Sequence, residues 1–286
     1  MPLKYAVHAY AWTSKWSNAT LDLIDRAKEF GFDFIEIPLM DIDLVDPQRI
    51  KERLDRVGIG AITSTALQEH QDVTNGDPEI RRRGIEYLVR CVKVSAEIGA
   101  KSFSGVIYSA MGKKIDTVPG EIYWEWASSA LREVARVAQD FDITIGIEPI
   151  NRYETFLINT CEQALRLREM VGEPNVGIHL DTYHMNIEEN NFYEPTKMAL
   201  PYLCHYHLSE SHRGTPGTGT VNWDEVFRAL AEGNYQGVVG MESFVEVAES
   251  MRPATCIWRK LAPSTEFLLK EGLRFLRSLE RKYYKE

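Results

Sequence analysis

Four side chains able to bind a metal ion stand at the ends of four successive apolar segments of the chain. They are Glu148, Asp181, His207 and Glu242. Short apolar runs of this kind are typical of buried β-strands. Three carboxylates and one imidazole suit a hard or borderline divalent cation better than a cation that prefers thiolates. We therefore predict one divalent metal site, for an ion such as Mn²⁺, Mg²⁺ or Co²⁺.

Each of these carboxylates, taken alone, has a simpler explanation. A carboxylate after a strand can cap the following helix or pair with a nearby cation. Three carboxylates crowded together, however, repel one another strongly unless a positive charge lies among them. The four residues as a set therefore favour a metal site over four unrelated structural roles.

The elements that position these residues alternate regularly along the chain. The expected strands cover 4–9, 33–38, 60–65, 101–106, 143–148, 176–181, 203–208 and 237–242. The expected helices cover 19–30, 47–57, 78–99, 120–140, 160–171, 194–200, 222–233 and 263–283. Eight such units predict an α/β fold, a (β/α)₈ TIM barrel, as a single domain over residues 1–286. In that fold the last inward-facing residue of each strand points to the active-site mouth.

Side chains on a strand point alternately inward and outward, and this alternation places two further histidines inside the expected barrel. His179 and His205 lie one layer below the expected metal site, at the level of Gly146 and Gly240. We hypothesise that the two glycines leave room for the two imidazoles. We also expect these histidines to be hydrogen-bonded core residues rather than metal ligands.

Composition excludes several classes of protein. The formal net charge of −9 argues against a nucleic-acid partner, which needs a basic face, and a neutral substrate fits better. Cys91, Cys161, Cys204 and Cys256 are scattered without a Cys-x-x-Cys pair, as expected for reduced thiols in a cytoplasmic protein. No signal-peptide pattern and no apolar run of about 18 residues occurs, so we expect no membrane association.

Four segments of the chain resemble the ketose 3-epimerases, of the D-tagatose/D-psicose 3-epimerase and L-ribulose 3-epimerase kind. The segments are GIEPINRYET (146–155), HLDTYHMNIEE (179–189), HYHLSESHRGTPGTG (205–219) and VVGMESF (238–244). These epimerases belong to the wider sugar-phosphate isomerase/epimerase barrels related to xylose isomerase. The resemblance covers nearly the whole chain. It implies a metal-dependent TIM-barrel enzyme that epimerises free ketoses at C3.

The resemblance also implies roles for individual residues. Glu148, Asp181, His207 and Glu242 resemble the family's metal ligands, and Glu148 and Glu242 also resemble its two proton-transfer bases. Glu154, His184 and Arg213 resemble its contacts with the carbonyl end of the sugar. The family's assembly implies a homodimer or homotetramer.

The chain departs from some family members where the far end of the sugar would bind. His8 stands on the first expected strand where others carry an aromatic residue, and the loop IYSAMGKK at 107–114 lacks a tryptophan that some members place there. We therefore expect His8 to contact the substrate, and the preferred ketose stays open.

Three alternative functions remain at this stage. A 1,2-aldose–ketose isomerase or a hydroxypyruvate-type isomerase could use the same metal site. A DNA-repair endonuclease of this barrel type needs a multi-zinc cluster, for which the early part of the chain offers only His8 and His70. A non-catalytic carbohydrate-binding protein would not need two carboxylate bases beside a metal. The two-base arrangement favours the epimerase because a proton must leave one face of C3 and return to the other.

Overall fold

Eight parallel strands close into a barrel in chain order. A computed structural model describes residues 3–284 of the chain. The strands are β1 (Lys4–His8), β2 (Phe34–Pro38), β3 (Gly60–Leu67), β4 (Ser102–Ala110), β5 (Thr144–Ile147), β6 (Val176–Asp181), β7 (Leu203–His207) and β8 (Val238–Met241). Pairing of β1 with both β2 and β8 closes the barrel. The predicted (β/α)₈ barrel is confirmed, and every expected strand is found.

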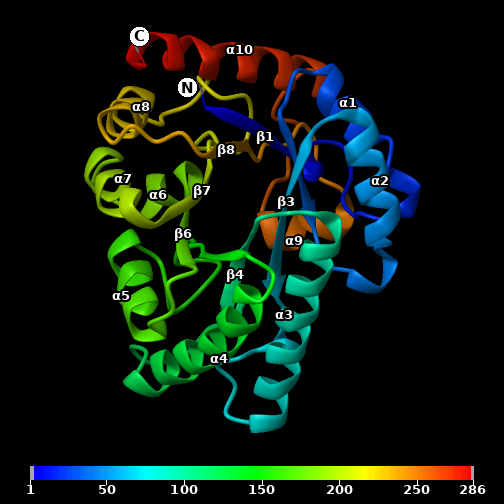
Figure 1. Cartoon of the computed structure of the whole chain (residues 1–286). Helices are drawn as coiled ribbons and strands as arrows, with labels where there is room; N and C mark the ends of the chain where they lie inside the picture. Colours follow the sequence, from blue (N-terminus) through cyan, green and yellow to red (C-terminus); the bar gives the residue numbers. More distant parts are fainter. Residues whose placement is uncertain (1–2, 285–286) are drawn as a thin grey trace.

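Helices surround the barrel as an outer ring (Figure 1). The longer ones are α1 (Leu23–Glu29), α2 (Pro47–Val57), α3 (Pro78–Ile98), α4 (Glu121–Gln139), α5 (Cys161–Val171), α7 (Tyr193–Ala199), α8 (Trp223–Glu232) and α10 (Thr265–Tyr283). Each overlaps a predicted helix. The helix expected at 19–30 is shorter, because a separate 3₁₀ turn (Asn18–Thr20) occupies its first part.

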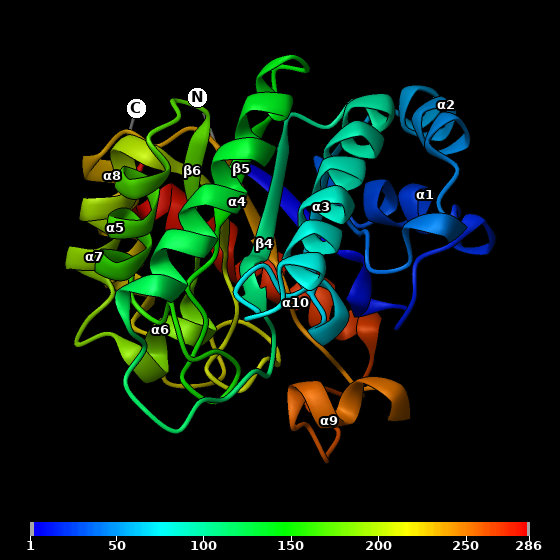
Figure 2. The same cartoon turned by 90° about the horizontal axis from the view of Figure 1, so that it is seen from below.

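Two short helices were not predicted. Helix α6 (Thr182–Glu188) follows β6 without a break, and α9 (Arg252–Thr255) lies in the long connection after β8. In Figure 2, α9 stands apart from the ring, below the strands. Both helices lie in connections that follow barrel strands, which is where the active-site loops of this fold are found.

Helix ends explain why the elements begin and stop where they do. Asp46 and Asp77 each cap the first turn of a helix whose first residue is proline. Gly58 and Gly99 end α2 and α3 with positive φ angles of 73° and 91°, a conformation that glycine adopts without a Cβ clash. These caps place β3 and β4 directly after the preceding helices.

Alternation along the strands separates the hydrophobic core from the barrel interior. Tyr5 and Val7 of β1 and Ile35 and Ile37 of β2 belong to the main hydrophobic cluster. Since successive side chains on a strand point to opposite faces, the residues between and after them face the interior of the barrel. The hydrophobic core thus lies mainly outside the barrel, and polar side chains can gather within it.

Two features of the sequence can be followed in the structure: helix hydropathy and the cysteines. Over residues 3–284, no helix is both long and apolar enough to cross a membrane. The four cysteines form no disulfide, and Cys91 and Cys161 are buried.

Candidate active site

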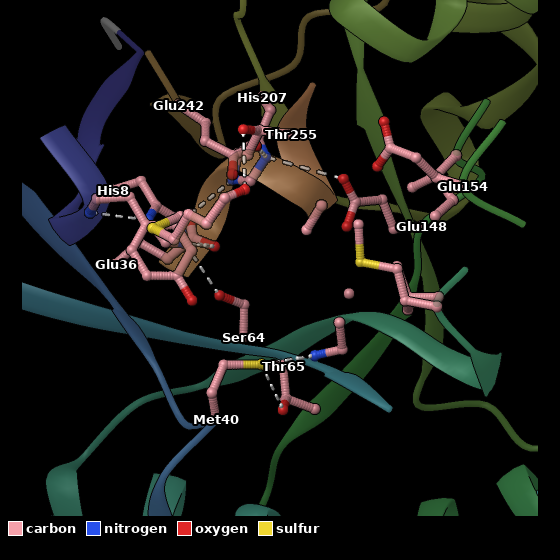
Figure 3. A pocket seen from close by; sticks show the side chains of 18 of the residues that line it. His8, Glu36, Met40, Ser64, Thr65, Glu148, Glu154, His207, Glu242 and Thr255 are labelled. Atoms are coloured by element: carbon pink, nitrogen blue, oxygen red, sulfur yellow. Dashed lines mark hydrogen bonds and ion pairs between the residues drawn. The ribbon is translucent and has the colours of Figure 1, made fainter. Parts of the chain in front are cut away.

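A cavity of about 480 Å³ opens at the carboxyl ends of the strands. Its volume lies in the usual range for small-molecule sites, roughly 300–1,000 Å³. Its lining includes all the expected site residues except Asp181, namely His8, Glu148, Glu154, His184, His207, Arg213 and Glu242. Figure 3 shows Glu148, His207 and Glu242 pointing toward one another, with His8 and Glu36 approaching from β1 and β2.

Three of the four expected metal ligands form one tight group. Glu148, Asp181 and His207 each offer a ligand atom within 4.8 Å of the others, and all three are buried. His207 Nδ1 lies 3.7 Å from Asp181 Oδ2 and 3.9 Å from Glu148 Oε1, and it has no hydrogen-bond partner. This buried nitrogen has no partner and faces carboxylate oxygens. Divalent cations bind at sites that combine oxygen ligands with an imidazole, so the arrangement fits such an ion.

Glu242 approaches the same nitrogen but pairs with an arginine. Its Oε2 lies 3.3 Å from His207 Nδ1 and accepts a hydrogen bond from Arg213 Nη1. The same Nη1 donates to Asp181 Oδ2 at 2.8 Å. The Arg213 guanidinium therefore balances two of the three carboxylates in this structure.

The two expected bases have different electrostatic surroundings. Burial raises the pKa of Glu148 well above its ordinary value, and the charges of Asp181 and Glu242 add to that effect. Burial also acts to raise the pKa of Glu242, but Arg213 and His207 outweigh it and hold that pKa well below the ordinary value. Two carboxyl groups whose surroundings separate their pKa values are a common basis for distinct acid and base roles.

Helix α6 sets the positions of Asp181 and His184. Asp181 Oδ1 accepts the main-chain N–H of Tyr183 at 2.8 Å, so this residue also caps α6. His184 lies in the first turn of α6, a helix that the sequence did not predict. The main-chain N–H of Asn151 donates to His184 Nδ1 at 3.1 Å, which ties the ring to the segment after β5.

Arg213 is held in place by its backbone and by an aromatic ring. Its φ of 62° is unusual for a non-glycine residue, and its N–H donates to Glu210 O. Its guanidinium carbon lies 4.2 Å from the centre of the Tyr183 ring, and Nη2 lies 3.1 Å from His184 Nε2. Arg213 and His184 thus lie side by side at the cavity wall, where both could donate hydrogen bonds to a substrate.

Glu154 and His8 line other parts of the cavity. Glu154 Oε1 accepts a hydrogen bond from Asn151 Nδ2 at 2.7 Å, which ties it to the same segment that orients His184. His8 Nδ1 accepts the main-chain N–H of Tyr10 at 3.1 Å, and Nε2 lies 3.5 Å from Ser64 Oγ. Met111, in the loop without the tryptophan, also lines the cavity.

Glu36 is the functional candidate that sequence reasoning missed. It has no exposed surface, and its Oε2 lies 2.7 Å from His207 Nε2 and 2.9 Å from His205 Nε2. Burial acts to raise the pKa of Glu36, but His207, His8 and His205 outweigh it and hold that pKa well below the ordinary value. A signal was available: an acidic residue at an interior position of an apolar strand rarely stays buried unless it is paired.

The layer below the site tests two expectations. A Cβ on Gly240 would lie 2.9 Å from His205 Cε1, so this glycine does make room for an imidazole. A Cβ on Gly146 would first meet Cys204 Sγ and Ser104 Cβ, both at 2.7 Å, and would reach His179 only at its Cβ, at 3.4 Å, so the closest contacts there are not with an imidazole. Neither ring nitrogen of His179 has a hydrogen-bond partner, although we expected a hydrogen-bonded core residue.

Known proteins share this architecture over nearly the full chain. The xylose isomerase-like TIM barrel family matches residues 24–279. A ketose 3-epimerase of Arthrobacter globiformis is 39% identical and covers 96% of each chain. An L-ribulose 3-epimerase of Methylomonas sp. is 36% identical over 96% of this chain and 97% of its own.

A solved structure supports the same relationship. The D-allulose 3-epimerase from Methylomonas sp. in complex with D-allulose superposes with a TM-score of 0.92 at 35% identity, covering 97% of both chains. The barrel, the residues gathered at its mouth and these likenesses lead to one conclusion: this chain belongs to the xylose isomerase-like TIM barrel family, among the ketose 3-epimerases.

Proposed function

We propose that this chain interconverts free ketoses by epimerisation at C3, through a cis-enediolate. The substrate pairs are D-fructose/D-psicose, D-tagatose/D-sorbose and L-ribulose/L-xylulose. One observation carries the proposal. Glu148 and Glu242 come from β5 and β8, on either side of β6 and β7, and both carboxylates approach the same nitrogen of His207.

Glu148 and Glu242 act as the two proton-transfer groups. Inversion at C3 requires a proton to leave one face of the carbon and another to arrive on the opposite face. A positioned carboxylate contributes about 10²–10⁴-fold to such a step. Each carboxylate serves one face of C3, so the group that removes the proton in one direction of the reaction returns it in the reverse direction.

Arg213 and His184 stabilise the negative charge that develops on the sugar oxygen at C2. Asn151 donates its main-chain N–H to His184 Nδ1, and His184 Nε2 lies 3.1 Å from Arg213 Nη2. An oxygen placed beside both atoms would accept a hydrogen bond from each, and prearranged donors of this kind stabilise the enediolate. Glu154 fixes the carbonyl end of the sugar, and His8 contacts its far end.

Glu148, Asp181, His207 and Glu242 would hold one divalent metal ion, with Mn²⁺ as the proposed ion and Co²⁺ or Mg²⁺ as substitutes. When bound, such an ion supplies Lewis-acid polarisation of the ketose carbonyl. Support comes from the buried, unpaired Nδ1 of His207 and from the carboxylate oxygens around it.

A panel assay tests the proposed function. The purified chain is incubated with D-fructose, D-tagatose or L-ribulose and Mn²⁺, and products are separated by chromatography. We expect D-psicose, D-sorbose and L-xylulose respectively, and loss of all turnover after treatment with EDTA. Turnover that survives complete removal of metal would contradict the metal site, and aldose products would contradict the epimerase.

We further propose that residues 1–286 form one domain, that the chain works in the cytoplasm, and that it assembles as a homodimer or homotetramer. The support is the resemblance to the family together with the scattered free cysteines. Light scattering coupled to size-exclusion chromatography gives the number of subunits directly.

A further inference from the structure

Glu36 is a fully buried carboxylate on β2, away from the four strands that carry the expected metal ligands. Its neighbour in register on β1 is His8, and its hydrogen-bond partners His205 and His207 lie on β7. Burying an ionised carboxylate is costly unless it is paired and hydrogen-bonded. The groups that pair with Glu36 therefore indicate why a carboxylate stands at this position.

One oxygen of Glu36 accepts two histidine N–H groups. Oε2 accepts from His207 Nε2 at 2.7 Å and from His205 Nε2 at 2.9 Å. Oε1 has no hydrogen-bond partner, and its nearest imidazole nitrogen is His8 Nε2 at 3.6 Å. The carboxylate is thus directed mainly at β7, as Figure 3 also shows for Glu36 and His207.

This contact fixes which nitrogen of His207 faces the site. With Nε2 donating to Glu36, the lone pair of the neutral ring lies on Nδ1, the nitrogen 3.3 Å from Glu242 Oε2 and 3.7 Å from Asp181 Oδ2. Turning the ring over would carry Nε2 away from Glu36 and Nδ1 away from the other carboxylates. Packing also restricts the orientation of the His207 ring, because His205 and His207 pack edge to face with ring centres 4.8 Å apart.

We infer that Glu36 is the positioning residue of the metal site: it orients His207 so that Nδ1 is presented to the ion. The inference rests on the proposed function, because it assumes that His207 binds a metal. A carboxylate that accepts the second N–H of a metal-binding imidazole fixes the ring and makes it a stronger ligand, and losing such a carboxylate typically weakens metal affinity about 10–100-fold.

The test measures metal binding without any sugar. The dissociation constant for Mn²⁺ is obtained from the electron paramagnetic resonance signal of the free ion, and the visible absorption of bound Co²⁺ reports its coordination. We expect Glu36→Gln, which keeps the shape but removes the charge, to raise the dissociation constant about 10–100-fold and to shift the Co²⁺ bands.

Asp72→Asn is the matched control. Asp72 is also a buried carboxylate, but it pairs with Lys113 at 2.7 Å and does not line the cavity. We expect this variant to lose stability while binding Mn²⁺ as the wild type does. A dissociation constant for Glu36→Gln within about twofold of wild type, or an equal loss in Asp72→Asn, would overturn the inference. Wild-type protein that binds no Mn²⁺ would instead overturn the metal part of the proposed function.

A second measurement uses the unmodified chain and decides the matter if Glu36→Gln fails to fold. Long-range ¹H–¹⁵N spectra of the Zn²⁺-loaded wild type show which ring nitrogen of His207 carries a proton. We expect a protonated Nε2 and an unprotonated Nδ1. A proton on Nδ1 with a bare Nε2 would overturn the inference.

Discussion

The two halves of the barrel mouth carry different chemistry. On the β5–β8 half, each strand ends at or next to one of the four expected metal ligands, which are Glu148, Asp181, His207 and Glu242. On the β1–β4 half, the polar interior residues include His8, Glu36 and Ser64, and the one carboxylate among them is buried and hydrogen-bonded to β7. We propose from this comparison that the β5–β8 half reacts with the substrate while the β1–β4 half supports and shapes the site.

Removing either base on the β5–β8 half has the largest expected effect. Glu148→Gln and Glu242→Gln should each lower kcat by up to about 10⁴-fold, because the amide cannot accept the C3 proton. Asp72→Asn, on the β1–β4 half, serves as the control and should keep kcat near the wild-type value. Wild-type rates in both directions for either glutamine variant, measured by chromatography, would refute the two-base assignment.

The donors on the same half should matter less than the bases. Arg213→Ala and His184→Ala should each lower kcat by about 10²–10³-fold, the usual loss when one donor to a developing oxyanion is removed. Steady-state kinetics in both directions separate this effect from weaker binding. A rise in KM with unchanged kcat would show that these residues bind the ground state only.

The packing beneath the site, within the β5–β8 half, can be broken through a glycine. A Cβ at Gly240 would lie 2.9 Å from His205 Cε1, so Gly240→Ala should lower the free energy of unfolding by about 1–3 kcal/mol. Gly76→Ala is the matched control, because no atom lies within 4 Å of the added Cβ. Equal urea midpoints for the two variants would contradict the close packing of His205.

The β1–β4 half should influence which sugar is preferred. His8→Ala should change the ratio of kcat/KM for D-fructose and L-ribulose by about tenfold, roughly the worth of one hydrogen bond. We expect kcat for the better substrate to change little. An unchanged ratio would mean that His8 does not contact the sugar.

The two halves also differ in how far the sequence predicts them. Glu148, Asp181, His207 and Glu242 were found because each stands at a strand end, and strand ends follow from local hydrophobic pattern. Glu36 was missed because its role depends on His207, 171 residues away in the chain, a contact that no local pattern reveals.

Other differences have similarly physical causes. Helix α6 has only seven residues, too few for a clear helical period, and its start depends on the Asp181 cap. Cys204, and not an imidazole, is one of the two nearest neighbours of Gly146, because Cys204 lies at the register shift between β6 and β7, where strict alternation fails. The roles of the site residues themselves stay predictions until the variants are measured.

The location of solvent deuterium in the sugar tests the central claim most directly. An epimerase that acts at C3 and a 1,2-isomerase both form an enediolate, but they remove protons from different carbons. The chain is incubated with Mn²⁺ and D-fructose in deuterated water, and the label is located by NMR. The account predicts deuterium at C3, with D-psicose as the product. Deuterium confined to C1, with an aldose as the product, would contradict it.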